Sequence, residues 1–331
     1  MNDTLTAIDG ILVGHDQNED GLTGCTSILF EQRNAVSAAI SSGGLPGTYN
    51  IGAALHAWQG VKYDAIFLTG GSIYGLDAAT GVRQFVEEKL RPQPTRQSGD
   101  LLSLLRGIVT GAVLFDLQAG SSQARPDAAM GYAAAANASR NPVVQGNVGA
   151  GCGATVGKFL GLKQAMKGGV GSICLEARDG FRVAALVAVN AFGNVFDSDT
   201  GKTIAGTRHP TGSGFLEFAE IIEKGLPVVS QPGQNTTLGV VVTDASLDSL
   251  LLTKMAQAGH LGLVRAVRPT HTSFDGDTFF EVSTAQRALS TPTLLFSPDA
   301  IMHLASEAVR LAILRAVQAA RSVGRIPGIG G

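Results

Sequence analysis

A short polar step separates a loop-like segment from an apolar run in the last third of the chain. Asn235-Thr236-Thr237 follows the proline- and glycine-containing segment 226–233, and the run 238–242 that comes next reads Leu-Gly-Val-Val-Val. An apolar run of this length next to turn residues predicts a fully buried strand. The chain must therefore place polar side chains at the point where an exposed loop enters a core.

This placement suits a chain that cuts its own backbone. The Thr236 Oγ can attack the Asn235 carbonyl, move the acyl group from nitrogen to oxygen, and leave an ester that water hydrolyses. Thr236 would then be a new N-terminal residue whose α-amine takes the proton of its own hydroxyl. An α-amine titrates near neutral pH, which suits general-base work. The alternative is a plain turn whose side chains hydrogen-bond their own backbone.

Composition narrows the function classes. The 331 residues are 44% hydrophobic with 6% aromatic residues and a formal net charge of −2, and the mean hydropathy is +0.19. The length suits one large domain or two ordinary ones. We see no basic patch and no stacking surface, so nucleic acid and charged membrane surfaces are not expected partners. Apolar runs stay below the roughly 18 residues of a membrane span.

The cysteines and the N-terminus indicate a location. Cys25, Cys152 and Cys174 are odd in number and form no Cys-x-x-Cys pair, so buried free thiols are expected. The first residues, Met-Asn-Asp-Thr, lack the basic and apolar pattern of an export signal. A reducing cytoplasm is the simplest location.

The order of elements predicts the fold class. Segments 25–30 and 35–40 read as a hairpin joined by a turn at 31–34, and 65–69 reads as a buried strand. A helix is expected from about Ile73 to Leu90 with Ser72 as its N-cap. Strands that come in hairpin pairs and are followed by helices favour an α+β fold with layered sheets over a doubly wound parallel sheet.

Other hydrolase designs find no support in the chain. Gly70-Gly71-Ser72-Ile73-Tyr74 lacks the last glycine of a nucleophile elbow. The chain has no His-Glu-x-x-His and its six histidines are isolated, so neither a zinc site nor a histidine triad is expected. Lys158 follows a glycine-rich stretch, but Phe159 stands where a phosphate loop needs Ser or Thr. We therefore expect no metal and no cofactor, and a nucleophile that needs no histidine.

Five blocks of the sequence stand in order along the chain: Gly43 to Thr48, Leu68 to Asp77, Gly149 to Lys158, Asn235 to Thr237, and Asp275 to Thr278. Together they resemble a known family, the self-processing L-aminopeptidase/D-esterase family, which includes β-peptidyl aminopeptidases and nylon-oligomer hydrolases. The blocks span nearly the whole chain, and five in register are far more specific than any one of them. The resemblance implies a four-layer αββα sandwich, a single domain 1–331 cut into 1–235 and 236–331, and homo-oligomers of the mature pair.

The resemblance also implies roles for five residues. Thr236 is the nucleophile and Asn235-Thr236 the cleavage site. Asp275 and Asp277 stand where the aminopeptidase branch has Ser-x-Glu, and with a Thr nucleophile this pattern is more similar to the nylon-oligomer branch. Asn190 and Lys158 match positions that line the catalytic centre. Physically, Asn190 can donate to an oxyanion, Lys158 can stabilise negative charge or keep the α-amine neutral by repulsion, and the two Asp can orient the Thr236 hydroxyl and the new ammonium.

Four further residues are expected to bind substrate. Gly70, Gly71 and Ser72 lie between a strand and a helix, where free N–H groups can face a cleft; a tight turn is the alternative reading. Phe115 stands where relatives carry Tyr, so a hydroxyl that donates to the intermediate would be missing there.

These residues predict a self-cleaving amide hydrolase. The expected substrates are short peptides, amino-acid amides or esters, and linear amide oligomers. Two alternatives remain open. The same acyl-enzyme can pass its acyl group to an amine, which makes an acyltransferase, or the fold can stay uncut as a non-catalytic binding protein.

Overall fold

The computed structural model describes residues 2–41, 44–56, 61–92, 105–177, 180–229, 234–288 and 298–330. Short 3₁₀ turns cover Leu5–Ala7, Ser72–Asp77 and Gly149–Gly151. The helices are α1 (Gly52–Leu55), α2 (Ala78–Phe85), α3 (Ala128–Ala136), α4 (Phe218–Glu223), α5 (Ser249–Val264) and α6 (Pro298–Ala319). The strands are β1 (Ile11–Asn18), β2 (Thr23–Ile40), β3 (Gly47–Tyr49), β4 (Lys62–Thr69), β5 (Val109–Val113), β6 (Thr155–Val156), β7 (Met166–Lys167), β8 (Gly169–Glu176), β9 (Arg182–Asn190), β10 (Asn194–Asp197), β11 (Lys202–Ala205), β12 (Thr236–Ala245), β13 (Val267–Arg268) and β14 (Thr278–Arg287).

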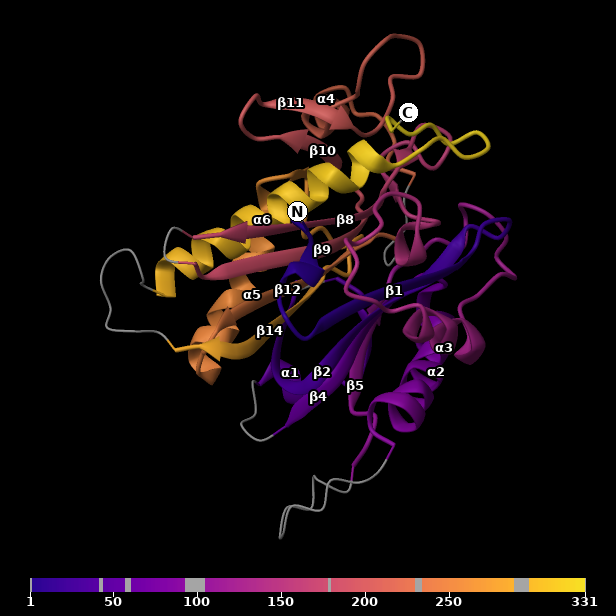
Figure 1. Cartoon of the computed structure of the whole chain (residues 1–331). Coiled ribbons are helices and arrows are strands. Elements are labelled where there is room, and N and C mark those ends of the chain that lie inside the picture. The colour runs from indigo at the N-terminus through magenta and orange to yellow at the C-terminus, as the bar shows by residue number, and fades with distance from the viewer. Residues whose placement is uncertain are drawn as a thin grey trace.

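One long strand, β2, joins two layers of sheet. The strand order is β3-β5-β4-β2-β14-β12-β9-β8, with β1 paired to β2. The first part of β2 pairs with β1 and β4, and its last residues, 35–40, pair with β14. A single hydrogen-bonded sheet therefore folds over on itself, with β1, β4 and β5 in one layer and β8, β9, β12 and β14 in the other (Figure 1).

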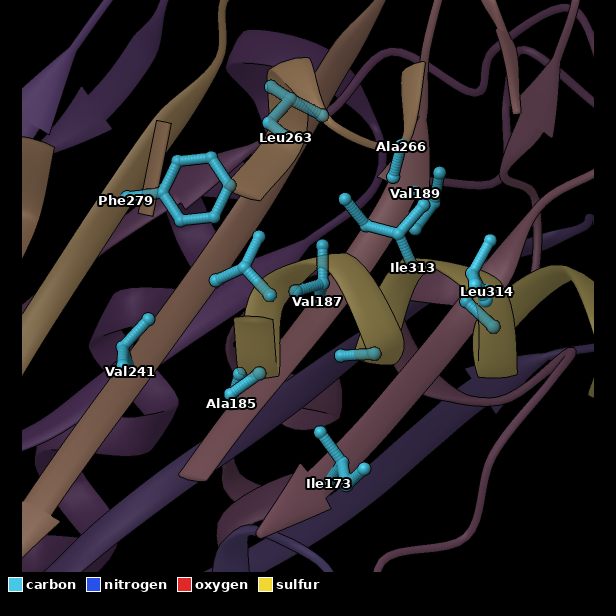
Figure 2. Packing of buried hydrophobic residues seen from close by; sticks show 14 of the residues in the cluster. Ile173, Ala185, Val187, Val189, Val241, Leu263, Ala266, Phe279, Ile313 and Leu314 are labelled. Atoms are coloured by element: carbon cyan, nitrogen blue, oxygen red, sulfur yellow. The ribbon is translucent and has the colours of Figure 1, made fainter. Parts of the chain in front are cut away.

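Helices cover the outer face of each layer, so the predicted αββα sandwich is confirmed. α5 and α6 lie on the layer of β8, β9, β12 and β14, and α2 and α3 lie on the layer of β1, β2, β4 and β5 (Figure 1). In Figure 2, Ile313 and Leu314 of α6 and Leu263 of α5 pack against Val187, Val189 and Val241. A separate apolar cluster fills the space between the two sheet layers.

Alternation along β9 explains why its sequence is apolar throughout. Val183, Ala185, Val187 and Val189 face α5 and α6, whereas Ala184, Leu186 and Ala188 face the other sheet layer. Successive strand residues point to opposite faces, and here both faces are buried. β12 follows the same rule, which confirms the buried strand expected after Thr236.

The hairpin predicted over 25–40 is wrong. These residues form the continuous strand β2, and the hairpin partner of β2 is β1. The polar stretch 31–34 lies where the register between β2 and β4 shifts. A tertiary contact explains why a polar residue stands at position 33 of this strand: the Arg33 Nε lies 2.9 Å from Oδ1 of buried Asp64. The turn-like composition therefore marks the crossing between layers.

The helix predicted from Ile73 to Leu90 is divided into three parts. A 3₁₀ turn over Ser72–Asp77 precedes α2, and a π-helical turn over Val86–Leu90 ends the segment. Ser72 does not cap it: Gly71 occupies the position before the turn at φ +79°, Ser72 follows at φ +55°, and no side-chain cap bond forms there.

Candidate active site

Thr236 begins β12 at the place where the sheet meets a loop. Its side chain is buried (3% exposed), and its cross-strand partner is Asn190, the last residue of β9. In the unbroken chain the Thr236 hydroxyl donates a hydrogen bond to the Asn235 carbonyl oxygen. The nucleophile expected from the sequence therefore contacts the peptide bond that it is expected to cut.

The Asn235 carbonyl is also held from the opposite side. The Gly276 N–H donates to that oxygen at 3.0 Å, and Asn235 forms a parallel bridge with Asp275. A Cβ at Gly276 would lie 3.0 Å from the Thr236 Oγ and 2.9 Å from the Leu45 carbonyl oxygen, so only glycine fits without displacement. The 275–277 loop thus reaches the Asn235–Thr236 bond with its backbone.

The two aspartates flank that glycine and bind backbone groups near the nucleophile. Asp277 Oδ1 accepts the Thr237 N–H at 2.8 Å, and Asp275 Oδ1 accepts the Phe192 N–H at 3.1 Å. Burial raises the pKa of Asp275 to about 6, and the negative charge of Asp277 is the second largest cause of this rise. Both carboxylates therefore orient the strand ends around Thr236 through the main chain.

Lys158 and Asn190 form the other side of the cluster. Lys158 Nζ donates to the Asn190 carbonyl oxygen at 2.9 Å and to its Oδ1 at 2.8 Å. Burial lowers the pKa of Lys158 to about 7, although the carboxylates of Asp275 and Asp116 act in the opposite direction. Near neutral pH this amine is present in both its charged and neutral forms.

Stacked aromatic rings fix the backbone that carries these groups. Phe192 stacks on Phe274 with ring centroids 4.8 Å apart, and it meets Phe159 at 5.0 Å. Phe159 follows Lys158 and Phe274 precedes Asp275 in the chain. Aromatic pairs of this kind add about 1 kcal/mol beyond their burial, so the cluster holds three separate segments in register at the site.

A cavity of about 640 Å³ opens beside Thr236. Ser72 and Phe115 contribute to its wall, while Gly70 and Gly71 lie behind it against Asp116, whose Oδ1 accepts the Gly71 N–H at 2.7 Å. The lining residues in the described part of the chain are uncharged: Leu45, Pro46, Gly47, Thr48, Ser72, Ile73, Leu76, Val113, Leu114, Phe115, Gln234 and Thr236.

A second, smaller cavity of about 190 Å³ shares Phe115 and Gln234 with the first. Its wall includes the ionisable side chains of Lys158 and Asp116, whereas the described lining of the larger cavity has no ionisable side chain of this kind. Phe115 stands between the two, and its carbonyl oxygen accepts the Asn190 Nδ2–H at 2.9 Å.

The family of the chain follows from comparison with known proteins. A model of peptidase family S58 matches residues 3–328. The chain belongs to this family. An uncharacterized aminopeptidase of Mycobacterium leprae is 34% identical over 98% of this chain and 92% of its own length. A 6-aminohexanoate-oligomer endohydrolase of Kocuria sp. is 31% identical over 93% of this chain and 84% of its own.

Solved structures share the fold. An L-aminopeptidase D-Ala-esterase/amidase from Ochrobactrum anthropi, described as a variant of the Ntn hydrolase fold, superposes with a TM-score of 0.69 at 21% identity, over 99% of this chain and 91% of that one. A Burkholderia sp. β-aminopeptidase gives 0.66 at 21% identity, over 100% and 91%. The S58 chain described here is thus a hydrolase of amide bonds, as expected.

Three residues that contact the candidate site of this S58 chain were not expected from the sequence. Asp116 was not expected at the site, yet it accepts the Gly71 N–H and lines the smaller cavity. Thr272 Oγ1 donates to Asp275 Oδ2 at 2.6 Å, and His271 Nδ1 lies 3.0 Å from Asp277 Oδ2. Asp116 had a local signal, since a carboxylate three residues after a buried strand can face the site at the end of that strand; the other two had none.

The described ranges contain no group of three His, Cys, Asp or Glu side chains arranged to hold a metal ion. Among the helices of those ranges, none combines the length and apolar character that crossing a membrane requires.

Proposed function

We propose that this chain cuts itself between Asn235 and Thr236 and then uses Thr236 as the nucleophile of an amide hydrolase. The observation that carries the proposal is the pair of contacts on one carbonyl: the Thr236 hydroxyl and the Gly276 N–H both bind the Asn235 oxygen. The proposed nucleophile and a donor that can stabilise an oxyanion therefore both contact the carbonyl of the bond to be broken.

The cut proceeds through an ester. Thr236 Oγ bonds to the Asn235 carbonyl carbon, its proton passes to a base, and the Gly276 N–H stabilises the charge that develops on oxygen. We assign the base to Lys158, whose pKa of about 7 leaves neutral amine available and which is bonded to Asn190, the cross-strand partner of Thr236. The C–N bond then breaks, the Thr236 nitrogen takes a proton, and water hydrolyses the ester to an Asn235 carboxylate.

Turnover repeats the chemistry on an external amide. The freed α-amine of Thr236 takes the hydroxyl proton, the oxygen attacks the substrate carbonyl, and water releases the acyl group. Asn190 Nδ2 donates one N–H to the Phe115 carbonyl oxygen, and its second N–H can donate to the oxyanion. Phe115 adds no hydroxyl to this donor set, so the oxyanion depends more heavily on Asn190.

The cavity supports a substrate whose part lying in this cavity is uncharged. Its described lining carries no carboxylate and no ammonium, and burying an unpaired charge there would be costly. Short peptides, amino-acid amides and esters, and amide oligomers are the proposed substrates. The M. leprae and Kocuria relatives, with their aminopeptidase and amide-oligomer names, lie within this range.

The mature form is proposed to contain chains 1–235 and 236–331 as one unit that assembles into homo-oligomers. A cytoplasmic location is supported by Cys25, Cys152 and Cys174, which are all free thiols.

Thr236→Ala tests the proposal. The wild-type protein is expected to give two bands on a denaturing gel, and sequencing of the smaller fragment should begin Thr-Thr-Leu-Gly-Val. The Ala variant, which lacks the attacking oxygen, should run as one full-length band and lose turnover of aminoacyl p-nitroanilides and amide oligomers by about 10³-fold or more. Thr236→Ser keeps a hydroxyl and serves as the matched control. Two bands from the Ala variant would eliminate Thr236 as the cutting residue.

A further inference from the structure

Three consecutive residues, Thr270, His271 and Thr272, hold the two aspartates of the site. Thr272 Oγ1 donates to Asp275 Oδ2 at 2.6 Å, and Thr270 Oγ1 lies 3.3 Å from Asp277 Oδ2. The same Asp277 oxygen lies 3.0 Å from His271 Nδ1. The segment therefore positions both carboxylates from one side, and His271 is the only one of its three side chains that can carry a charge.

His271 is held in a conformation that costs free energy. Its φ is +55°, in the left-handed region, where a residue with a Cβ is disfavoured by roughly 1–2 kcal/mol. Residues persist in such conformations when their surroundings over-determine them, often at functional sites. The backbone here directs the imidazole at a carboxylate that is only 1% exposed, while the ring itself is 27% exposed.

The direction of the hydrogen bond follows from the chemistry of the pair. An ionised carboxylate only accepts, so His271 donates its Nδ1–H to Asp277 Oδ2. The other oxygen, Oδ1, accepts the Thr237 N–H at 2.8 Å. A continuous line of contacts thus runs from a partly exposed ring, through a buried carboxylate, to the residue directly after the nucleophile.

We propose that His271 is a positioning residue for Thr236: it holds the Asp277 carboxylate in the orientation that fixes the Thr237 N–H and so the start of β12. The inference rests on the proposed function of Thr236. Before the cut, Thr236 is restrained from both sides, because Asn235 is bound by Gly276. After the cut nothing covalent precedes Thr236, and its placement depends on Thr237 and on the pairing with Asn190. His271 therefore matters more to turnover than to cleavage.

The charges around His271 favour this role. Asp277, the residue before β14, contacts it. Asp275 is a second carboxylate nearby, and burial and the charge of Asp277 raise its pKa to about 6. From α5, the ring of His260 packs on it at a centroid distance of 4.8 Å. Burial lowers the pKa of His260, which keeps that neighbour neutral near pH 7. The Nδ1 atom of His271 thus faces a carboxylate, and its ring packs on a second imidazole.

Two variants separate the hydrogen bond from the backbone conformation. His271→Asn keeps a donor near the Nδ1 position, and His271→Gly removes it; both residue types tolerate a left-handed backbone. We expect the Gly variant to lower kcat by about 10–100-fold, as small displacements of reacting groups do. Its KM should stay unchanged, because the described lining of the 640 Å³ cavity does not include His271. The Asn variant should stay within about 3-fold of the wild-type kcat, because it keeps the donor to Asp277.

A wild-type kcat in the Gly variant, or equal losses in both variants, would overturn the proposal. A measurement that needs no turnover supports it independently. In the uncut Thr236→Ala chain, ¹⁵N NMR of the histidines should show His271 with a protonated Nδ1; an unprotonated Nδ1 would refute it. Absence of cleavage and turnover in the wild-type protein would instead refute the proposed function, so the two failures are distinguishable.

Discussion

Asp116 shows how much a single buried carboxylate can shape this site. Its Oδ1 binds the Gly71 N–H, and a Cβ at Gly70 would lie 1.9 Å from its Oδ2. Glycine at position 70 therefore makes room for the carboxylate, which explains the Gly-Gly pair better than a substrate contact does. Burial raises the pKa of Asp116 to about 6, against the hydrogen bond from Gly71 and the charge of Lys167.

This pKa sets the sign of a pH dependence. Between the unfolded value of 3.8 and about 6, the folded state keeps a proton that the unfolded chain has lost. The free energy of unfolding therefore falls as pH rises through this window, and Asp275 acts in the same direction. Asp116→Asn, made in the uncut Thr236→Ala chain, keeps the acceptor for Gly71. Between pH 4 and pH 7 its free energy of unfolding should rise by ~2 kcal/mol relative to that of its parent, as measured by urea unfolding.

Asp20→Asn supplies the control, because Asp20 is exposed. Parallel stability-versus-pH curves for Asp116→Asn and its parent would contradict the assigned pKa.

At the level of single residues, the sequence named Thr236 and the residues that the structure gathers around it, but not the residues that support this cluster. Asn-Thr-Thr before an apolar run is a local pattern, and Asp275 and Asp277 belong to a block that resembles a known family. His271 and Thr272 carry no comparable signal. A lone histidine between two threonines becomes informative only when folding places it 3.0 Å from Asp277.

At the level of elements, α2 and α3 pack through glycines. A Cβ at Gly81 of α2 would lie 1.7 Å from the Ala128 carbonyl oxygen, and one at Gly131 of α3 would lie 2.1 Å from the Ala78 carbonyl oxygen. The two helix backbones therefore touch directly, which brings both onto the outer face of β2 and β4.

Gly131→Ala tests that contact, because two effects oppose each other. Alanine favours a helix interior over glycine by about 1 kcal/mol, but here its methyl group must push two backbones apart, which typically costs about 1–3 kcal/mol or more. We expect a net loss of ~2 kcal/mol in the free energy of unfolding. Gly52→Ala in α1 has open space around the new methyl group and should leave stability unchanged or slightly raised. A stabilised Gly131→Ala chain would show that α2 and α3 can separate at little cost.

Among the elements, β12 could be predicted because its apolar run is long and follows turn residues. β2 could not. Its polar residues 31–34 imitate a turn, and the partner that keeps Arg33 in a strand, Asp64, lies far along the chain. Local composition reports the polarity of such a segment but not the tertiary contact that explains it.

At the level of the whole molecule, the proposed cut would interleave two chains in one sheet. Residues 236–331 supply the parallel pair β12 and β14, which lies between β9 and β2 of residues 1–235. Two strand pairs join the fragments, β12 with β9 and β14 with β2, and each pair is connected by a continuous ladder of backbone pairing. We therefore expect the two fragments to co-elute in native size-exclusion chromatography at the volume of the uncut Thr236→Ala protein, and to separate only in denaturant. Separate elution of the fragments in native buffer would contradict this arrangement.

The Gly276 contact has a consequence for how the protein is made. On the proposed chemistry, the Asn235–Thr236 bond is stable until the ribosome has delivered the loop that follows it and β14 has docked beside β12. A nascent or truncated product would be an inert zymogen. Activation would then be timed by completion of the sheet, and no outside protease would be needed to start it.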